Sequence, residues 1–343
     1  MKKIISAILA ALLLIACLSG CTGTSPNDAQ KTADAQSQSS SDETVYTLKV
    51  GNVLAADDPI TLGLEKWAAS VKEKTDGHVL IEVYPNSTLG DSVEVLEQII
   101  AGSDIGVMAD TGMLADYVPD MAIYTAPYIF NSPENARAFV DSDMFKGWND
   151  TLATFGIRDL GCNWYQGARN FLTNTPVEKP EDLSGLRVRT MGTTVAQESM
   201  KAFGCIPTSL AWSEVYSGMS SKVIDALEAQ NTAIHGASLQ EVVKYITKTE
   251  HFLLYTALVV SENWYQKLPE EYRNILEQEA LTAGDYATDL TKELEQKYYE
   301  EFEAAGVTVN EVDKTPFIEA ASSVYETMGW TDLKAQIDAA VGQ

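Results

Sequence analysis

The residues of this chain best suited to chemistry are three arginines in one short stretch. The chain has six arginines, and Arg169, Arg187 and Arg189 are three of them. In LRVRT (186–190) apolar residues alternate with the last two arginines, which predicts a strand with both guanidinium groups on the face opposite the apolar one. A guanidinium is planar and permanently charged, and it can hold a carboxylate through two parallel hydrogen bonds. The pattern indicates an anion-binding site, with an ordinary surface pair on an edge strand as the alternative.

Five short motifs before and after these arginines follow one another in a characteristic order. They are YPNSTLGD (84–91), APYIF (126–130), GAR (167–169), DLSGLRVR (182–189) and WSEVYSGMSSKVID (212–225). In this order and spacing, from about Leu48 to Gly329, the chain resembles the solute-binding proteins of TRAP (tripartite ATP-independent periplasmic) transporters, especially the dicarboxylate and sugar-acid binding family. The resemblance implies a binding protein that captures a small organic acid and delivers it to the membrane subunits of the transporter.

The resemblance also assigns roles to individual residues. Arg189 matches the arginine that grips the ligand's carboxylate in this family, and Arg169 matches the arginine that often assists it. Trp212 stands where the family has an aromatic ring that packs against the ligand's carbon frame, although a core tryptophan ahead of a helix would give the same pattern. Glu214 fits better as a residue that caps or orients the following helix than as a ligand contact.

The segment IDALEAQN (224–231) departs from the family pattern. Many members have D-G-x-E-N-P there, with an asparagine that hydrogen-bonds the substrate, whereas this chain has Ala229 at that place. Glu228 is retained, and Gln230 or Asn231 could supply an amide from a shifted position. Glu228 and Asn231 therefore join the predicted ligand-binding residues, and the departure leaves the identity of the substrate open.

An alternation of strands and helices is expected to position these residues. Strands are predicted at 47–54, 78–85 and 105–109, with a helix in each interval. The second helix begins at a capping box formed by Asp91 and Glu94. Such alternation is typical of a parallel sheet with crossover helices, in which ligands bind beyond the carboxyl ends of the strands. Asn52, after the first strand, and Asp110, after the third, are therefore candidate ligand contacts.

The fold class that follows is α/β, with two periplasmic-binding-protein-like lobes that each contain a mainly parallel sheet flanked by helices. Predicted strands at 157–167 and 256–263 bracket the arginine segment, so the chain is expected to cross between the lobes on these strands. A helix from Pro269 to Ala305, capped by Gly306, is long for one domain, and sharing it between two lobes would explain its length. The predicted boundaries are 46–166 with 255–294 for lobe I, and 167–254 with 295–343 for lobe II.

The first residues read as a lipoprotein targeting segment. Two lysines precede an apolar run that is too short to span a bilayer, and LSGC (18–21) is a lipobox. We expect a signal peptide over 1–20, cleavage before Cys21 and attachment of lipid to its sulfur, with a plain secretory signal as the alternative. Residues 21–45 are polar and predict a flexible tether. The protein is then extracytoplasmic and attached to the membrane by its lipid alone.

The charge of the chain argues against nucleic acid and anionic lipid as partners. Its formal net charge is −25, from 24 Lys and Arg against 49 Asp and Glu. An anionic ligand remains compatible, because a desolvated arginine pair dominates its own surroundings while distant surface carboxylates are screened. Of the four cysteines, Cys17 leaves with the signal and Cys21 takes the lipid. For Cys162 and Cys205 a disulfide and two buried free thiols are both open.

Enzyme activity, a cofactor and a bound metal are not expected. The chain has three histidines, at 78, 235 and 251, and no HExxH, GxSxG or P-loop motif. His235 could form a dyad with Glu228, but solvated side chains are the commoner outcome at that spacing, and no histidine has neighbours at metal-ligand spacing. We expect a monomeric binding protein, with a lipoprotein that presents its ligand to a sensor kinase as the alternative function.

The predicted contacts favour a small monocarboxylic acid with hydroxyl groups, such as a sugar acid, over a C4-dicarboxylate. One carboxylate would neutralise Arg189, whereas ionised Asp110 and Glu228 would repel a second negative group. Hydroxyl groups could instead donate hydrogen bonds to those carboxylates while the carbon frame packs on Trp212. The C4-dicarboxylate remains the alternative because Arg169 could accept a second carboxylate if it turned inward.

Overall fold

The first part of the chain forms the predicted alternation of strands and helices. The computed structural model describes residues 44–343, so the expected signal peptide, the lipidated Cys21 and nearly all of the tether lie outside the described residues. The first elements are β1 (Tyr46–Gly51), α1 (Pro59–Lys74), β2 (Val79–Tyr84), α2 (Ser92–Ile100) and β3 (Ile105–Asp110). The capping box of Asp91 and Glu94 at the start of α2 is confirmed.

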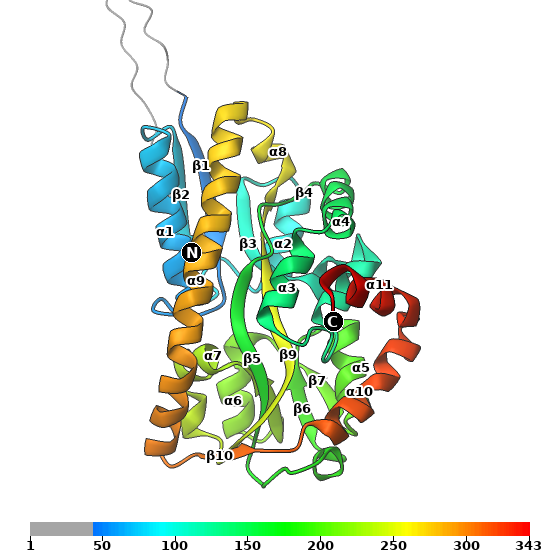
Figure 1. Ribbon diagram of the computed structural model, residues 1–343. Coiled ribbons are helices and arrows are strands. Elements are labelled where there is room, and N and C mark those ends of the chain that lie inside the picture. The colour runs from blue at the N-terminus through cyan, green and yellow to red at the C-terminus, as the bar shows by residue number, and fades with distance from the viewer. Residues whose placement is uncertain (1–43) are drawn as a thin grey trace, which may run out of the picture. The chain divides into compact units, whose positions relative to one another are not determined.

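The remaining elements fill the segment that holds the arginines and the C-terminal part of the chain (Figure 1). Up to the arginine segment they are η1 (Thr111–Asp116), η2 (Pro119–Thr125), α3 (Pro133–Val140), α4 (Asp143–Thr154), β4 (Ile157–Asp159) and β5 (Trp164–Thr173). Next come η3 (Pro180–Leu183), β6 (Arg187–Thr190), α5 (Thr194–Ala202), β7 (Ile206–Ser209), η4 (Trp212–Glu214), α6 (Val215–Ser220), β8 (Ala226–Ala229), α7 (Asn231–Gly236) and η5 (Leu239–Glu241). The last are β9 (Tyr245–Ser261), α8 (Glu262–Tyr265), α9 (Glu270–Ala304), β10 (Thr308–Glu311), α10 (Thr315–Thr327) and α11 (Thr331–Val341).

Two long strands, β5 and β9, connect the two lobes. The strand order is β2-β1-β3-β9-β5-β8-β6-β7, so β9 pairs with β3 of lobe I on one side and with β5 on the other. The pairings of β1 with β2 and β3, and of β6 with β7 and β8, are parallel, whereas β9 runs antiparallel to β3 and to β5. The predicted strand 157–167 is divided into β4 and β5 by an irregular stretch at 160–163, which contains a bend at Cys162.

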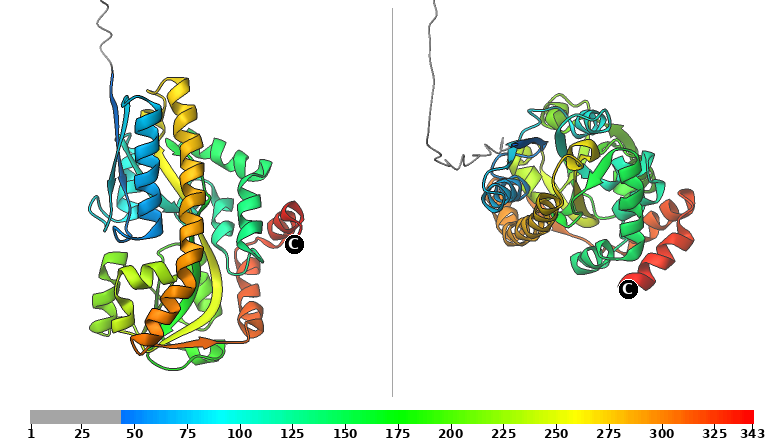
Figure 2. Two further views of the ribbon diagram at one scale, coloured as in Figure 1. Left: turned by 60° about the vertical axis from the view of Figure 1, so that its left-hand side comes forward. Right: turned by 90° about the horizontal axis from the view of Figure 1, so that it is seen from above.

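Helix α9 is the predicted long helix and contains 35 residues. It packs against α1 at one end and against α7 further along, and Figures 1 and 2 show α1 and α9 side by side. Gly63 of α1 permits this close packing, because a Cβ atom there would lie 2.9 Å from the Cβ of Ala287 and 2.8 Å from the ring of Trp164. The Trp67 indole also donates a hydrogen bond to the carbonyl of Leu276 (3.0 Å). Burying an aromatic ring of this size contributes about 2–3 kcal/mol.

The C-terminal helices divide their contacts between the two lobes. Phe317 of α10 packs with Phe171 and Phe203, in the apolar cluster of lobe II. Trp330 and Ile337 instead belong to the apolar cluster that holds α3, α4 and β3 of lobe I. The assignment of all of 295–343 to lobe II is therefore wrong for the last part of that range. Sequence pattern shows that a helix has an apolar face and does not show which neighbour that face meets.

Two further expectations concern residues inside the fold. Cys162 and Cys205 are both buried free thiols, which decides between the two alternatives for this pair. Within residues 44–343, no helix is long and apolar enough to cross a membrane.

Candidate ligand-binding site

A cavity of about 160 Å³ lies between the residues that follow β1 and β3 and those that follow β6, β7 and β8. The carboxyl ends of these strands meet here, as expected for an open α/β sheet. Four of the predicted ligand-binding residues line the cavity, namely Asp110, Arg169, Arg189 and Trp212. Both lobes contribute to its wall, so a bound molecule would contact both.

Arg189 is a buried cation that has no anionic partner among the residues that the structure describes. Its side chain projects from β6, only 6% of the residue is exposed, and it makes no ion pair with any residue among 44–343. Nε donates a hydrogen bond to the carbonyl of Leu210 (3.0 Å), and the guanidinium carbon lies 5.3 Å from the ring centre of Trp212. Burial, with the nearby charge of Arg169, lowers the pKa of Arg189 to about 10. An unpaired buried charge is costly, and an anion in the cavity would offset that cost.

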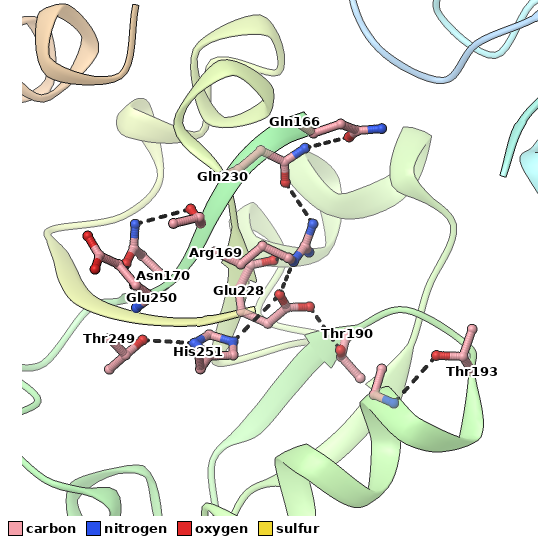
Figure 3. Close-up of polar contacts among 12 residues, drawn as sticks. Gln166, Arg169, Asn170, Thr190, Thr193, Glu228, Gln230, Thr249, Glu250 and His251 are labelled. Atoms are coloured by element: carbon pink, nitrogen blue, oxygen red, sulfur yellow. Dashed lines mark hydrogen bonds and ion pairs between the residues drawn. The ribbon is translucent and has the colours of Figure 1, made fainter. Parts of the chain in front are cut away.

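Arg169 is already satisfied by the protein. Its Nε is hydrogen-bonded to the carboxylate of Glu228, Nη2 donates to the backbone carbonyl of Glu228 (2.6 Å), and Nη1 donates to Oε1 of Gln230 (2.7 Å) (Figure 3). This pairing neutralises the positive charge of Arg169 within the wall. Arg169 therefore lines the cavity without offering a free charge to a ligand.

Glu228 lies behind Arg169 and not in the cavity wall. It is fully buried, accepts a hydrogen bond from Thr190 Oγ1 (2.8 Å), and its Oε2 is 3.8 Å from Nε2 of His251. Burial alone would raise the pKa of Glu228, but the charge of Arg169 and the hydrogen bonds from His251 and Arg169 outweigh it and lower that pKa. Glu228 was predicted as a ligand contact, and the geometry instead gives it the role of holding Arg169.

The two arginines of LRVRT have different surroundings, although they were expected to share a face. Arg187 is exposed, and its Nε and Nη2 donate to the carboxylate of Asp225 (2.9 and 2.8 Å). Arg189, two residues later, is covered by the segment that follows β7. The difference comes from what lies over each end of the strand, which alternation along the chain cannot show.

Asp110 lines the cavity at the end of β3. Its Oδ1 accepts a hydrogen bond from the backbone N–H of Gly112 (2.6 Å), so the carboxylate also caps the turn of η1. Burial raises the pKa of Asp110 to about 6, against the lowering effects of that hydrogen bond and of Arg169. Asp110 therefore holds a proton more tightly than an ordinary aspartate does.

Asn52 and Asn231 do not line the cavity. Asn52 donates to Thr61 Oγ1 (2.7 Å) and accepts from the backbone N–H of Leu54 (3.3 Å), which stabilises the turn after β1. Asn231 donates to the carbonyl of Glu295 in α9 (3.0 Å). Both were predicted as ligand contacts, and the structure uses both amides to hold backbone segments together.

Gln166 lines the cavity and was not among the predicted residues. A register shift between Tyr165 and Gly167, where Gly167 has a φ of 120°, breaks the regular alternation of β5 at this point. Gln230, which was considered as an amide donor, lines the cavity too. The only signal for Gln166 was its position three residues before Arg169, because a bulge cannot be foreseen from periodicity.

The histidines do not form the dyad that was considered. His235 stacks on Tyr298, with 4.3 Å between ring centres, and lies 3.5 Å from Glu301 rather than beside Glu228. His251 is buried and stacks on Phe171 at 4.6 Å. In the part of the chain that the structure describes, no group of three or more His, Cys, Asp or Glu side chains could hold a metal ion.

Two glycines allow close contact between the lobes near the cavity. A Cβ atom on Gly112 of lobe I would lie 3.0 Å from Cβ of Thr193 in lobe II and 2.9 Å from Oδ1 of Asp110. A Cβ atom on Gly236 of lobe II would lie 2.9 Å from Cβ of Ala55 in lobe I. Neither glycine lines the cavity itself. The close approach of the two lobes therefore depends on the absence of side chains at these two positions.

We expect Gly112→Ala and Gly236→Ala to weaken ligand binding. The methyl group at position 236 meets Ala55, outside the cavity wall, whereas the one at position 112 also meets Oδ1 of Asp110 in the wall. Each added methyl group overpacks the contact between the lobes and should raise the free energy of the form with the lobes together by about 1 kcal/mol or more. If the form with the lobes apart is unaffected, the affinity falls about fivefold. Calorimetry measures the affinity, and X-ray scattering should show a larger radius of gyration with ligand than for the parent protein. Gly147→Ala in α4 is the control, because nothing lies within 4 Å of its Cβ position. Unchanged affinity in both variants would contradict a role for these contacts.

Fold and cavity together define a two-lobed solute-binding protein. Helices surround a sheet whose long strands join the lobes, and a charged cleft lies between the lobes. The family "Bacterial extracellular solute-binding protein, family 7" (DctP) matches residues 50–331, and this chain belongs to that family. The family description is that of a binding protein in transport and not of an enzyme.

Individual relatives are similar over most of their length. The C4-dicarboxylate-binding periplasmic protein DctP of Rhodobacter capsulatus is 31% identical over 265 residues, which are 76% of this chain and 78% of that protein. An apo open structure of a TRAP periplasmic solute-binding protein from Escherichia fergusonii is 39% identical, with a TM-score of 0.76 over 85% of this chain and 99% of that chain. A TRAP solute-binding protein from Actinobacillus succinogenes 130Z, with bound L-galactonate, is 31% identical, with a TM-score of 0.84 over 87% and 99%.

Proposed function

We propose that this protein is the extracytoplasmic solute-binding component of a TRAP transporter and captures a small organic acid, a sugar acid or a C4-dicarboxylate, for delivery to the membrane subunits. The observation that carries the proposal is Arg189, a buried guanidinium that lines the cavity with no carboxylate partner in the described residues. A ligand carboxylate supplies the missing anion and, with two parallel hydrogen bonds, matches the guanidinium in shape as well as charge.

Trp212 supports the same reading. Its ring is half-buried at the cavity and stacks near the guanidinium of Arg189, so it forms an apolar wall directly beside the charged group. A carboxylic acid with a short carbon frame has the same arrangement of one charged end next to an apolar surface. C4-dicarboxylate, which one relative binds by its name, and L-galactonate, which is bound in a similar solved structure, are ligands of this kind.

The protein is anchored in this proposal by lipid on Cys21, after cleavage of the signal peptide at the lipobox LSGC (18–21). It acts as a monomer, and the two lobes close on the ligand by a hinge in β5, β9 and α9. We place the lobes at 46–166 with 255–294 and at 167–254 with the start of 295–343. Family membership favours delivery to a transporter over presentation to a sensor kinase.

A thermal-shift screen of the chain from residue 22 onward tests the proposal. The panel contains hexonates, hexuronates, C4-dicarboxylates, neutral sugars and amines at equal concentration. A ligand at one hundred times its dissociation constant adds about 2.7 kcal/mol of stability, which raises the melting temperature by several degrees. Stabilisation by organic acids is the expected result. Stabilisation only by neutral sugars or amines would overturn the anion-binding function itself.

A further inference from the structure

Two glutamine side chains, Gln166 of β5 and Gln230 after β8, form a hydrogen-bonded pair in the cavity wall. Both are buried and both line the cavity. Nε2 of Gln230 donates to Oε1 of Gln166 (2.8 Å), and Nε2 of Gln166 donates to Oγ1 of Thr256 (3.1 Å). Figure 3 shows the two amides in line with Arg169, which begins the chain of hydrogen bonds.

Arg169 fixes the orientation of this pair. A guanidinium has donors only, so the atom of Gln230 that faces Nη1 of Arg169 at 2.7 Å must be the oxygen. The amide nitrogen of Gln230 then faces the oxygen of Gln166, and the nitrogen of Gln166 faces Thr256, whose hydroxyl donates onward to the carbonyl of Trp164 (3.4 Å). Flipping either amide would place two donors or two acceptors against each other.

The fixed orientation leaves donors for a ligand. Each amide nitrogen carries two hydrogens, and within residues 44–343 each of these two nitrogens makes one hydrogen bond. The second N–H of Gln166 and of Gln230 is therefore free to bind an oxygen atom in the cavity.

The charges around the pair distinguish a neutral oxygen from a carboxylate. Arg169, beside the pair, is already neutralised by Glu228, so the pair offers hydrogen bonds without net positive charge. Asp110 also lines the cavity and would repel a second carboxylate or take up a proton to accommodate it. Among residues 44–343, Arg189 is thus the positively charged group of the wall that remains for an anion.

We propose that Gln166 and Gln230 determine specificity, because they bind a hydroxyl or carbonyl oxygen of an acid whose single carboxylate is held by Arg189. The site then selects a hydroxylated monocarboxylic acid over a dicarboxylate. This inference rests on the proposed capture of an organic acid. The uncharged part of the ligand is then recognised by the two glutamines and not, as the sequence predicted, by Glu228.

Calorimetry on matched acids tests the inference. Each hexonate or hexuronate is compared with the aldarate of the same configuration, in which the terminal CH2OH or aldehyde carbon is a second carboxylate. We expect the aldarate to bind at least tenfold more weakly. Gln166→Met keeps the size of the side chain and removes its donors, and should weaken binding of the best monocarboxylate by about tenfold. Gln230→Met should act in the same direction. Gln278→Met, an exposed position of α9, is the matched control and should have no effect.

Deoxy analogues of the best ligand separate recognition from structural damage. For the analogue that lacks the hydroxyl facing the pair, Gln166→Met should cost nothing further. An equal loss for the parent acid and every analogue would overturn the inference, as would an aldarate that binds as tightly as its monocarboxylate. If no carboxylate of either kind binds the parent protein, the proposed function fails before the question of the glutamines arises.

Discussion

Arg189→Met should lower the affinity for carboxylates by about 1,000-fold and at the same time make the ligand-free protein more stable. Removing one partner of a buried, hydrogen-bonded charge pair costs roughly 2–5 kcal/mol of binding free energy. Without ligand, Arg189 has no anion to pair with in residues 44–343, and burial lowers its pKa to about 10. Replacing it with a similar apolar side chain should therefore raise the free energy of unfolding by about 1–3 kcal/mol.

The opposite signs of these two effects make the prediction informative. A variant that fails to bind because it is misfolded loses stability, whereas Arg189→Met should melt at a higher temperature and still fail to bind. Arg189→Lys keeps the charge but cannot make the planar two-bond contact, so we expect it to lose affinity by tenfold or more. Calorimetry and thermal unfolding of the same preparations measure both quantities.

Arg187→Met is the matched control for this experiment. It lies two residues earlier on β6, is exposed, and pairs with Asp225 on the surface. It should leave the affinity for ligand unchanged, since surface ion pairs contribute little. Binding by Arg189→Lys within twofold of the parent protein would show that Arg189 does not hold the carboxylate.

The second large effect is expected at Glu228, and it concerns stability. Glu228→Leu leaves the guanidinium of Arg169 buried and without its anion, which should cost about 3–5 kcal/mol of unfolding free energy and lower the melting temperature by roughly 10 °C. Urea denaturation gives the free energy. The double variant Arg169→Met with Glu228→Leu removes both charges and should recover most of the loss. A double variant as unstable as the single one would mean that the charge pairing is not the cause.

The pH dependence of stability follows from the direction of the pKa shift. Arg169 and the hydrogen bonds to Glu228 hold the pKa of this carboxyl below its unfolded value of 4.5. Its stabilising contribution is therefore complete above pH 4.5 and is lost as the pH falls toward the folded value. In Glu228→Gln the unfolding free energy should fall less steeply with acid below pH 4.5 than in the parent protein. Asp110 acts oppositely, since its raised pKa makes a contribution that is lost as the pH rises through about 6.

Local sequence determined the elements near the site and singled out Arg189 as the candidate anchor. Three features depend only on side chains a few residues apart in the chain, namely the capping box at Asp91, the long helix ended by Gly306 and the strand of Arg189. The sequence pattern is therefore enough to predict them. The order of motifs along the chain identified the family for a similar reason. A motif records a local arrangement that relatives share.

Tertiary structure alone decided what each polar side chain of the site faces. Glu228 and Arg169 are 59 residues apart and neutralise each other because β8 and β5 are neighbours in the sheet. Gln166 reaches the cavity through a bulge in β5 that interrupts the alternation on which sequence reasoning relies. Asn52 and Asn231 carry the same amide group as the glutamines, but both are used to hold backbone segments. A residue type sets which hydrogen bonds a side chain can make, whereas the partners that fill them come from strands distant in sequence, so the free donors and the free charge appear only once the chain is folded.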